Sequence, residues 1–311
     1  MDQTNKATAF AVFFFPPTDF YAEIDQVLPT LAPDFHGPAE AFRRNLESVI
    51  STTALPFQMA TSAVLQRRFQ QLNIAERIRA RAHIDESGEV PESAQREAVD
   101  IARARFEEEK KAPDSANRFG DQVLADLVGL ASHNAFGSAA FELLRQGTVL
   151  VWGALEVLAQ DLFVVFVNKH PRAALDLMRD ERTKRYFQLR DIPLDTLAEY
   201  DFNLSERLGA VIVRDRAIDN LTTIRATFDV LAPGNEAMRT ALAEDDLWKL
   251  NQRRHLIVHR RGIVDSAYLQ KTGDVVAIGS DLRVSPKELE RYLELVRTAG
   301  LSLLRALMRA V

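Results

Sequence analysis

The sequence predicts an all-α fold that carries one small β-hairpin. Over most of the 311 residues, apolar side chains recur at intervals of three and four, which places them on one face of a helix. Proline, glycine and capping residues mark the ends of these stretches. The clearest strand-like alternation is in residues 274–284, where Gly279 and Ser280 would form the turn. We therefore expect helices packed on helices, with the hairpin as a local addition.

The length of the chain suits two domains better than one. Residues 57–82 and 92–111 carry helical periodicity and are separated by a turn-like stretch. After residues 112–117 the composition becomes more apolar. We therefore expect a helical N-terminal module of unknown role over residues 1–116 and a second helical domain over residues 117–311.

The other elements are predicted from their composition and their end signals. Residues 7–15 are apolar and would form a buried strand or a short core segment. Ser285-Pro286-Lys287-Glu288 supplies an N-cap, a proline at the first helical position and a capping-box glutamate for a helix to about Ala310. Between these points we expect a short helix to about Ser132 and a long helix over residues 137–168. A further helix starts near Pro171, and another covers residues 205–231. Asn235 would cap a helical segment that reaches Arg261, with a break near residues 244–246.

Composition predicts a cytoplasmic protein that does not enter a membrane. Residues 147–167 approach membrane-spanning length, but they contain Glu156, Gln160 and Asp161 and are expected to form a buried helix. The sequence has no cysteine, which excludes disulfides and thiolate metal sites. The formal net charge of −5 argues against a general polyanion binder, so any contact with nucleic acid must be local.

One stretch, residues 251–262, combines basic side chains with histidines. Arg254 precedes His259 by five residues, and this pair has the minimum parts for cleaving RNA. An arginine can stabilise a phosphorane, and a histidine can move protons near neutral pH. The neighbouring candidates for substrate binding are Asn251, Arg253, Arg260 and Arg261. A plainer interpretation is that cations at a helix end complement its dipole, which would explain Arg260 and Arg261 but not Arg254.

Helical spacing places Arg254 in a row of apolar residues that would face the core, namely Leu247, Leu250, Ile257 and Val258. Glu156 interrupts a similar apolar row on the long helix. A buried charge without a partner is costly, so an ion pair between Glu156 and Arg254 is the simplest arrangement that satisfies both. An ordinary structural ion pair with no catalytic part is the alternative.

The segment Arg254-His255-Leu256-Ile257-Val258-His259 resembles the Arg-x4-His motif of HEPN domains (higher eukaryote and prokaryote nucleotide-binding), including the polar residue after the arginine. Residues 262–265, Tyr268, the hairpin at Gly273 and the capped final helix are also similar to prokaryotic members of that family. The resemblance covers about residues 117–311 and leaves the N-terminal third outside it.

The resemblance implies an all-helical, HEPN-like bundle that forms a homodimer and brings two copies of the motif together. It implies a metal-independent endoribonuclease without a cofactor, a toxin or antiphage-defence effector that acts on RNA beside an antitoxin or a defence-system partner. By position in the motif, His259 would be the general acid or base and Arg254 would hold the scissile phosphate. His255 would orient the others or contact phosphate, and Glu156 would match an acid that some relatives carry in their first long helix.

Two other functions stay open. His255 and His259 are four residues apart and could bind a metal, but no glutamate follows His255 as the zinc-protease motif requires, and no third ligand is evident. The chain could also be a non-catalytic scaffold or a nucleotide- or RNA-binding interaction module, as some HEPN domains are. An intact pair of Arg254 and His259 favours the enzyme.

Overall fold

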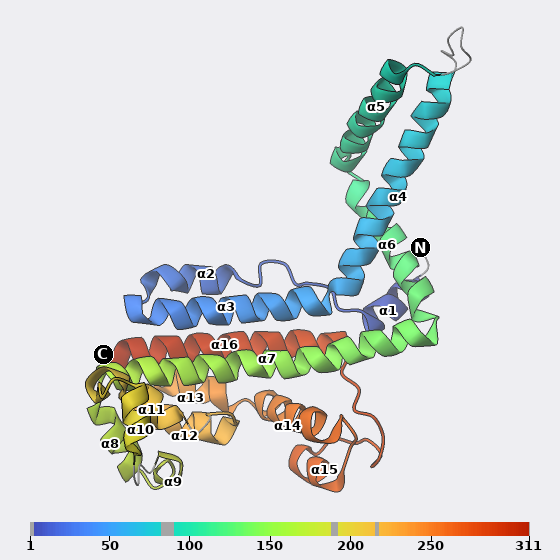
Figure 1. Ribbon diagram of the computed structural model, residues 1–311. Helices are drawn as coiled ribbons and strands as arrows, with labels where there is room; N and C mark the ends of the chain where they lie inside the picture. The colour runs from blue at the N-terminus through green and yellow to red at the C-terminus, as the bar shows by residue number, and fades with distance from the viewer. Residues whose placement is uncertain (1–2, 82–89, 188–191, 215–217, 311) are drawn as a thin grey trace. The chain divides into compact units, whose positions relative to one another are not determined.

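The structure is a computed structural model that describes residues 3–81, 90–187, 192–214 and 218–310. These residues form sixteen α-helices and one short 3-10 helix, with no β-strand among them, so the all-α prediction is confirmed. By its internal contacts the chain divides into two compact units (Figure 1). Unit 1 comprises Met1–Phe15 and Thr53–Phe141, and unit 2 comprises Pro16–Thr52 and Glu142–Val311. The boundary expected between residues 116 and 117 falls inside unit 1, and residues 16–52 belong with the C-terminal helices.

Unit 1 is built around a helical hairpin. Its helices are α1 (Gln3–Val12), α4 (Leu55–Ala80), α5 (Glu92–Lys111), α6 (Ser115–Ala131) and the first turns of α7 (Asn134–Lys169). The helices predicted over residues 57–82 and 92–111 are therefore confirmed. The core of the unit brings together apolar side chains from all of these helices except α5, among them Phe13, Val64, Leu127 and Ala140.

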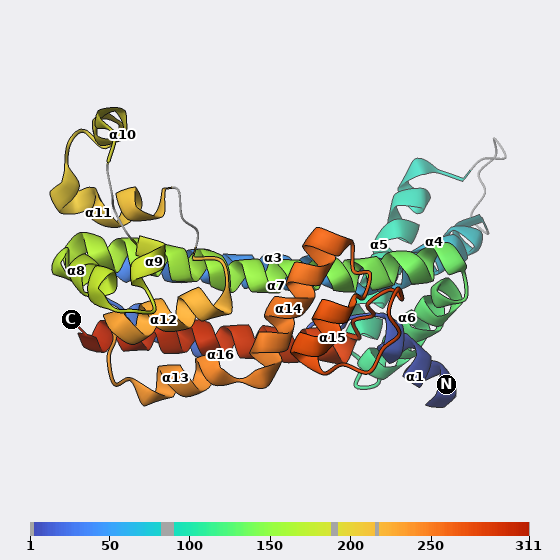
Figure 2. The same ribbon diagram turned by 90° about the horizontal axis from the view of Figure 1, so that it is seen from below.

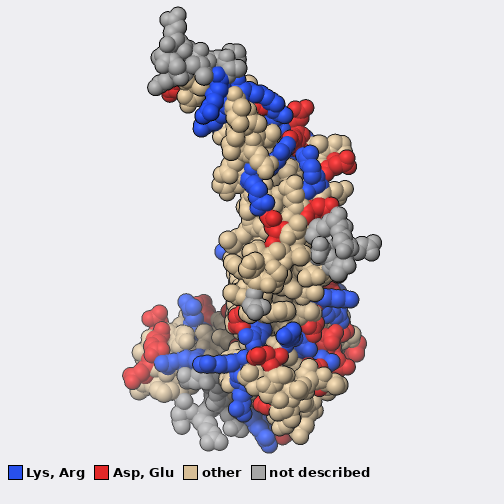
Figure 3. All heavy atoms as spheres, turned by 90° about the vertical axis from the view of Figure 1, so that its right-hand side faces the viewer, with Lys and Arg blue, Asp and Glu red and all other residues tan. Residues whose placement is uncertain are grey.

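The surface of the α4–α5 hairpin carries both signs of charge, which are interspersed at the top of the view in Figure 3. Arg68 of α4 makes two hydrogen bonds to Glu109 of α5, at 2.6 and 2.8 Å. Glu76 is buried and contacts both Arg79 and Arg105. Ion pairs between two helices help to set how the helices align along each other. Because both signs are present, the surface is not the uniformly positive one that a polyanion binder needs.

Unit 2 contains three long helices that run side by side, with shorter helices on them (Figures 1 and 2). The long helices are α3 (Pro33–Thr53), the remainder of α7, and α16 (Pro286–Ala310). The shorter elements are α2 (Ala22–Val27), η1 (Leu28–Thr30), α8 (Arg172–Arg179), α9 (Lys184–Phe187), α10 (Leu194–Glu199), α11 (Leu204–Val213), α12 (Leu221–Leu231), α13 (Glu236–Ala243), α14 (Asp245–Arg260) and α15 (Ser266–Thr272). Helices α12, α13 and α14 contact α16, and α14 also contacts α15.

Gly300 of α16 lies where the three long helices meet. A β-carbon at this position would lie 2.6 Å from Cε1 of Phe42 in α3 and 2.9 Å from Cδ2 of Leu158 in α7. Both of those side chains are almost completely buried. The close approach of the three helices therefore depends on the absence of a side chain at residue 300.

The β-hairpin predicted over residues 274–284 is wrong, although its turn is present. Gly279 has a φ of 82°, and the Ser280 N–H donates to the Ala277 carbonyl at 3.1 Å. Val275 is 99% exposed and Ile278 is also largely exposed, so the residues before the turn have no sheet to join.

The residues after that turn pair with a different segment. The Leu282 N–H donates to the Gly262 carbonyl at 2.8 Å, and a single antiparallel bridge joins Ile263 to Asp281. Leu282 and Val284 are buried, and Leu282 packs in a cluster with Leu256. Their alternation with exposed neighbours therefore reflects burial in the core and not pairing across the turn.

Two further predictions need correction. Residues 7–15 do not form a strand, because α1 covers them up to Val12, although their role as a core segment is confirmed by the buried Phe13 and Phe14. A short apolar run is compatible with either element. The single helix expected over residues 205–231 is two helices, α11 and α12. Asn220 accepts a hydrogen bond from the Thr223 N–H at 2.9 Å and starts the second of them as its N-cap.

Most predicted helix ends are confirmed. Asn235 caps α13, where its side chain accepts from the Met238 N–H at 3.0 Å, and a break at Glu244 separates α13 from α14. In the capping box of α16, the Glu288 N–H donates to Ser285 Oγ at 3.2 Å and the Ser285 N–H donates to Glu288 Oε2 at 2.8 Å.

Helix α7 is the most apolar of the described helices. Its residues Ala135–Lys169 are long and apolar enough, by length and composition, to cross a membrane. Half of its most apolar window is buried inside the structure, and the core helix of a folded domain passes the same test.

Candidate functional site

Helix α14 carries the residues of the Arg-x4-His motif. Asp245 and Asp246 lie in its first turn, where negative charge complements the helix dipole. The helix ends at Arg261, which adopts a left-handed conformation with a φ of 55° and is followed by Gly262 with a φ of 77°. The Gly262 N–H donates to the Leu256 carbonyl at 3.1 Å and closes the last turn. His259 therefore lies in the last turn of a helix with a defined end.

The buried face of α14 is centred on Arg253 rather than on Arg254. Leu250, Arg253 and Leu256 are buried, whereas Val258 is 49% exposed. In the predicted row, Leu247, Leu250 and Ile257 are thus confirmed as core residues, whereas Val258 and Arg254 lie at the edge of the buried face. Successive residues of a helix are separated by about 100°, so an error of one residue in the assignment moves a side chain from the core to its edge.

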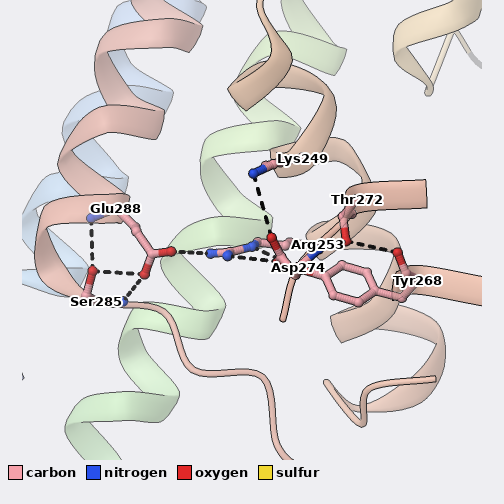
Figure 4. Close-up of polar contacts among 7 residues, drawn as sticks. All are labelled: Lys249, Arg253, Tyr268, Thr272, Asp274, Ser285 and Glu288. Atoms are coloured by element: carbon pink, nitrogen blue, oxygen red, sulfur yellow. Dashed lines mark hydrogen bonds and ion pairs between the residues drawn. The ribbon is translucent and has the colours of Figure 1, made fainter. Parts of the chain in front are cut away.

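Arg253 is held by acceptors from three other segments of unit 2 (Figure 4). Its guanidinium donates to Glu288 Oε1 at 2.6 Å, to Asp274 Oδ2 at 3.1 Å and to the Tyr268 hydroxyl at 3.2 Å. It also lies over the Tyr292 ring, 5.9 Å from the centroid. The side chain of Arg253 is only 10% exposed. These contacts hold α14 against α15 and α16, and they use the guanidinium edges with which Arg253 could otherwise bind a substrate.

Both carboxylates in this cluster are kept charged by their partners. Burial alone would raise the pKa of Asp274, but the hydrogen bond from Tyr268 and the charge of Arg253 outweigh it and lower that pKa. Burial likewise opposes ionisation of Glu288, yet the Ser285 N–H and Arg253 lower its pKa. Lys249 adds a longer contact to Asp274 at 3.7 Å. The charges therefore compensate one another inside the fold.

A cavity of about 360 Å³ lies on the adjacent face of α14. Four of the predicted site residues line it, namely Asn251, Arg254, His255 and His259. The rest of its lining comes from α14, from α15 and from the start of α12, in the form of Asp219, Asn220, Thr222, Trp248, Gln252 and Lys271. Three segments of unit 2 therefore line the cavity, and the arginine and both histidines of the Arg-x4-His motif are among the lining residues.

Arg254 contacts Glu156 at one edge of this cavity, as the sequence predicted. Its Nη2 donates to Glu156 Oε2 at 3.3 Å, and each side chain is 23% exposed. Within the described part of the chain, Glu156 is the single acceptor in reach of this guanidinium. Burial and the nearby charge of Asp219 raise the pKa of Glu156, and the charge of Arg254 lowers it only in part. Arg254 thus keeps donors that a ligand in the cavity could use.

Trp152 of α7 holds the segment that contributes Asp219 to the cavity wall. It is fully buried on α7, one helical turn before Glu156, and its Nε1–H donates to the Asp219 carbonyl at 3.2 Å. This contact ties the segment before α12 to the helix that carries Glu156. A buried indole with a satisfied N–H is a rigid anchor, so the spacing between Glu156 and Asp219 is set by packing.

The two histidines of the motif lie against each other on the solvent side of the cavity. Their ring centroids are 4.4 Å apart with an interplanar angle of 48°, and both side chains are exposed. Burial and the nearby His259, Lys271 and Arg254 lower the pKa of His255 below its usual value of 6.5. At neutral pH His255 is therefore mainly the neutral imidazole, which can accept a proton or a hydrogen bond.

The remaining candidates for substrate binding occupy different surroundings. Asn251 is buried and lines the cavity, where its Oδ1 accepts from the Gln252 side chain at 3.4 Å. Arg260 is exposed and lies 3.6 Å from Asp265. Arg261 is exposed at the end of α14, and its carbonyl accepts from Arg145 at 3.5 Å. Arg260 and Arg261 are not part of the cavity wall, although they lie on the same turn as His259.

Sequence reasoning missed the other half of the cavity wall. On α14 a signal was available, because Trp248, Gln252, His255 and His259 recur at spacings of four, three and four and so share one face. Lys271 and Asn220 come from other helices and carry no local signal. In the described residues, no group of three or more His, Asp or Glu side chains gathers in a metal-binding arrangement.

No protein-family model, curated protein or solved structure matches the chain. The assignment of a function to this site therefore depends on the chemistry of the residues that line it.

Proposed function

We propose that the protein is a metal-independent endoribonuclease of the HEPN type. It would cleave RNA by attack of a ribose 2′-hydroxyl on the neighbouring phosphorus, leaving a 2′,3′-cyclic phosphate. The observation that carries this proposal is the convergence of Arg254, His255 and His259 on one cavity in which Arg254 is oriented by Glu156. A guanidinium and two imidazoles are sufficient for transesterification at phosphorus.

Arg254 would bind the scissile phosphate. Its one hydrogen bond within the described structure goes to Glu156, so the other N–H groups of the fork can donate to phosphate oxygens. As the 2′-oxygen bonds to phosphorus, negative charge accumulates on the non-bridging oxygens, and a fixed cation there stabilises the transition state. Glu156 would act as a positioning residue that holds the guanidinium in place.

The histidine pair would manage the two proton transfers. One imidazole, in its neutral form, takes the proton of the 2′-hydroxyl. The other, in its protonated form, donates a proton to the 5′-oxygen as the bond between that oxygen and phosphorus breaks. His259 would serve as the general acid or base. His255, whose lowered pKa keeps it mainly neutral, would be the partner that accepts a proton or orients His259. Asn251 would contact the substrate from the cavity wall, with Arg260 and Arg261 at its mouth.

The family resemblance extends the proposal to assembly and biological role. We expect a two-fold homodimer that brings two copies of α14 together, in line with the commonest symmetry of oligomers. Val258 on α14 and Ile263 just beyond it expose apolar side chains, which supports an interface there. In this proposal the enzyme is a cytoplasmic toxin or antiphage-defence effector that cuts RNA beside an antitoxin or a defence-system partner.

The decisive experiment incubates the purified full chain with RNA in EDTA and identifies the product ends. We expect cyclic phosphate ends from the wild type and at least about a hundredfold loss of rate in Arg254→Ala and His259→Ala. The matched controls are Arg172→Ala and His133→Ala, which change exposed residues outside the cavity. Cleavage that survives either motif substitution, or that disappears in EDTA, contradicts the mechanism. RNA binding without cleavage would instead identify a non-catalytic RNA-binding module.

A further inference from the structure

A second cavity, of about 450 Å³, adjoins the candidate site. Thr222, an exposed residue at the start of α12, lines both cavities and is their common border. The wall of the second cavity includes Arg182, Arg185, Tyr186, Arg225 and Asp229. Three arginines and an aromatic ring therefore lie immediately beside the cavity that holds the motif.

Two of these arginines form no ion pair within the described residues. Arg225 of α12 is partly buried, and its Nε donates to the Leu242 carbonyl at 2.6 Å. Burial lowers the pKa of Arg225, and the charge of Asp245, which is not close enough for an ion pair, offsets that lowering only in part. Arg185 of α9 is exposed and makes no ion pair or hydrogen bond to the described part of the chain. A partly desolvated guanidinium without a carboxylate is a favourable place for an anion.

The acidic residues of this wall are already neutralised. Asp229 lies 2.9 Å from Arg182 and 3.1 Å from Arg239. Glu181, which also lines the cavity, contacts Lys184. The charges of Arg185 and Arg225 therefore dominate the field inside the second cavity.

Packing on α7 gives this wall a fixed position. Phe187, the last residue of α9, is buried and stacks on Phe163 of α7 with ring centroids 5.2 Å apart. Tyr186 precedes it and is 40% exposed where it lines the cavity. A partly exposed ring on a fixed helix beside cations is the combination that stacks an unpaired base next to its phosphate.

We propose that the second cavity is a nucleotide subsite, so that single-stranded RNA binds across Thr222 and occupies both cavities. In this arrangement the scissile phosphate contacts Arg254, and a nucleotide further along the strand contacts Arg185, Arg225 and the Tyr186 ring. This inference rests on the proposed function, because it extends the same site to a longer substrate. It also selects the substrate class, since a base inside a duplex cannot stack on Tyr186.

The test measures RNA binding separately from cleavage. The probe is a fluorescent single strand of about ten nucleotides with 2′-O-methyl groups, long enough for one site and resistant to cleavage. Anisotropy titrations over a range of salt concentrations compare the full-length wild type with Arg185→Gln, with Arg225→Gln as a second variant checked by circular dichroism. Arg172→Gln is the control, because Arg172 is also exposed, belongs to unit 2 and lies outside both cavities.

We expect Arg185→Gln to weaken binding about five- to tenfold and to reduce the slope of log Kd against log salt by about 0.7, the value for one lost contact to a single strand. Arg172→Gln should match the wild type. In EDTA, the loss of kcat/KM in Arg185→Gln should be larger for a cleavable single strand of about ten nucleotides than for a dinucleotide.

Equal Kd values and salt slopes for Arg185→Gln and the wild type would overturn the subsite, and so would failure of the wild type to bind the probe. A duplex of the same length that competes equally well would overturn the preference for single strands. A wild type that binds the probe in the expected way but cleaves no RNA would overturn the proposed function and leave the subsite standing.

Discussion

Glu156 of α7 and Arg254 of α14 are 98 positions apart in the chain, yet Arg254 Nη2 lies 3.3 Å from Glu156 Oε2. Arg254 also lines the cavity that holds the motif histidines, called here the motif cavity. Neither residue is fully buried, and neither is fully solvated. The contact orients Arg254 without consuming its other donors. A partly exposed ion pair contributes less to folding stability than a deeply buried one. Its main consequence here is the orientation of the guanidinium toward the cavity.

The first prediction concerns Glu156. Glu156→Ala should lower the free energy of unfolding by only about 1–3 kcal/mol, because the pair is partly hydrated, but it should lower RNA cleavage at least about tenfold. Glu156→Gln keeps an acceptor for Arg254 and should recover most of the activity. Urea unfolding and initial cleavage rates measure the two effects. Glu290→Ala on the exposed face of α16 is the matched control. Normal cleavage by Glu156→Ala would remove the positioning role.

The second prediction concerns the titration of His255. Because the nearby His259 and Lys271 contribute to lowering the pKa of His255, either His259→Ala or Lys271→Gln should move that pKa upward toward 6.5. Histidine side-chain NMR over a pH series measures the shift directly. Lys287→Gln, at an exposed position at the start of α16, should leave the titration of His255 where it is. An unchanged pKa in both cavity variants would contradict the electrostatic coupling.

The third prediction concerns how the stability contributed by Arg253 depends on pH. Asp274 and Glu288 have pKa values below their usual 3.8 and 4.5, so their pairing stabilises the fold above those values and is lost as the pH falls through the lowered ones. Arg253→Met should cost about 3–5 kcal/mol at neutral pH, because it removes the guanidinium that both partly buried carboxylates contact. The difference from the wild type should shrink as the pH falls through the lowered pKa values, because both carboxylates then become protonated.

Urea unfolding at neutral pH and over an acid pH series measures that difference. Arg260→Met removes an exposed pair with Asp265 and should cost less than about 1 kcal/mol at every pH in the series. A cost for Arg253→Met that does not depend on pH would show that packing, and not charge pairing, is what the residue contributes.

The fourth prediction concerns Gly300. Gly300→Ala places a methyl group against Phe42 and Leu158 and should destabilise the protein by about 1–3 kcal/mol through overpacking. Gly129→Ala in α6 is the control, since a β-carbon there meets nothing within 4 Å and alanine favours the helix by about 0.5–1 kcal/mol. Thermal unfolding should therefore move in opposite directions for the two variants. A stabilised Gly300→Ala would contradict the tight contact of the long helices.

The fifth prediction concerns assembly. Light scattering at micromolar concentration should give twice the monomer mass of 35.0 kDa. Val258→Asp should shift the protein toward the monomer, because it places a charge in the expected interface on α14. Leu175→Asp changes a similarly exposed apolar residue of α8 and should leave the mass unchanged. A monomeric wild type would remove the dimer from the proposal.

The sequence was informative wherever the determining interaction is local. The capping box of Ser285 and Glu288, the cap at Asn235 and the helical periodicity of residues 92–111 involve neighbours in the chain, and the structure confirms them. The Glu156–Arg254 contact was also predicted, because the cost of an unpaired buried charge does not depend on chain distance.

The predictions that failed required knowledge of distant partners. Arg253 and Arg254 are adjacent and chemically alike, and only the positions of Asp274 and Glu288 make Arg253 the buried one. Leu282 and Val284 are buried, and Leu282 pairs with Gly262 and not with the residues before the turn, so the alternation in the sequence resembled a hairpin. Lys271 of α15 and Asn220, the N-cap of α12, line the cavity beside Arg254 only in the folded chain, so no local pattern announces them.

The exposed stretch from Val275 to Ile278 begins directly after Asp274, which Arg253 holds in place, and ends where Gly279 donates to the Val264 carbonyl at 2.8 Å. Both ends of the stretch are held by hydrogen bonds or ion pairs within unit 2, whereas its side chains are exposed. The entropic cost of closing a loop rises only slowly with loop length, so extra residues inserted there would destabilise the fold little. A peptide tag or a small reporter domain inserted between Val275 and Val276 would leave α14 undisturbed. The protein thus offers an internal attachment point for labelling that does not involve either terminus.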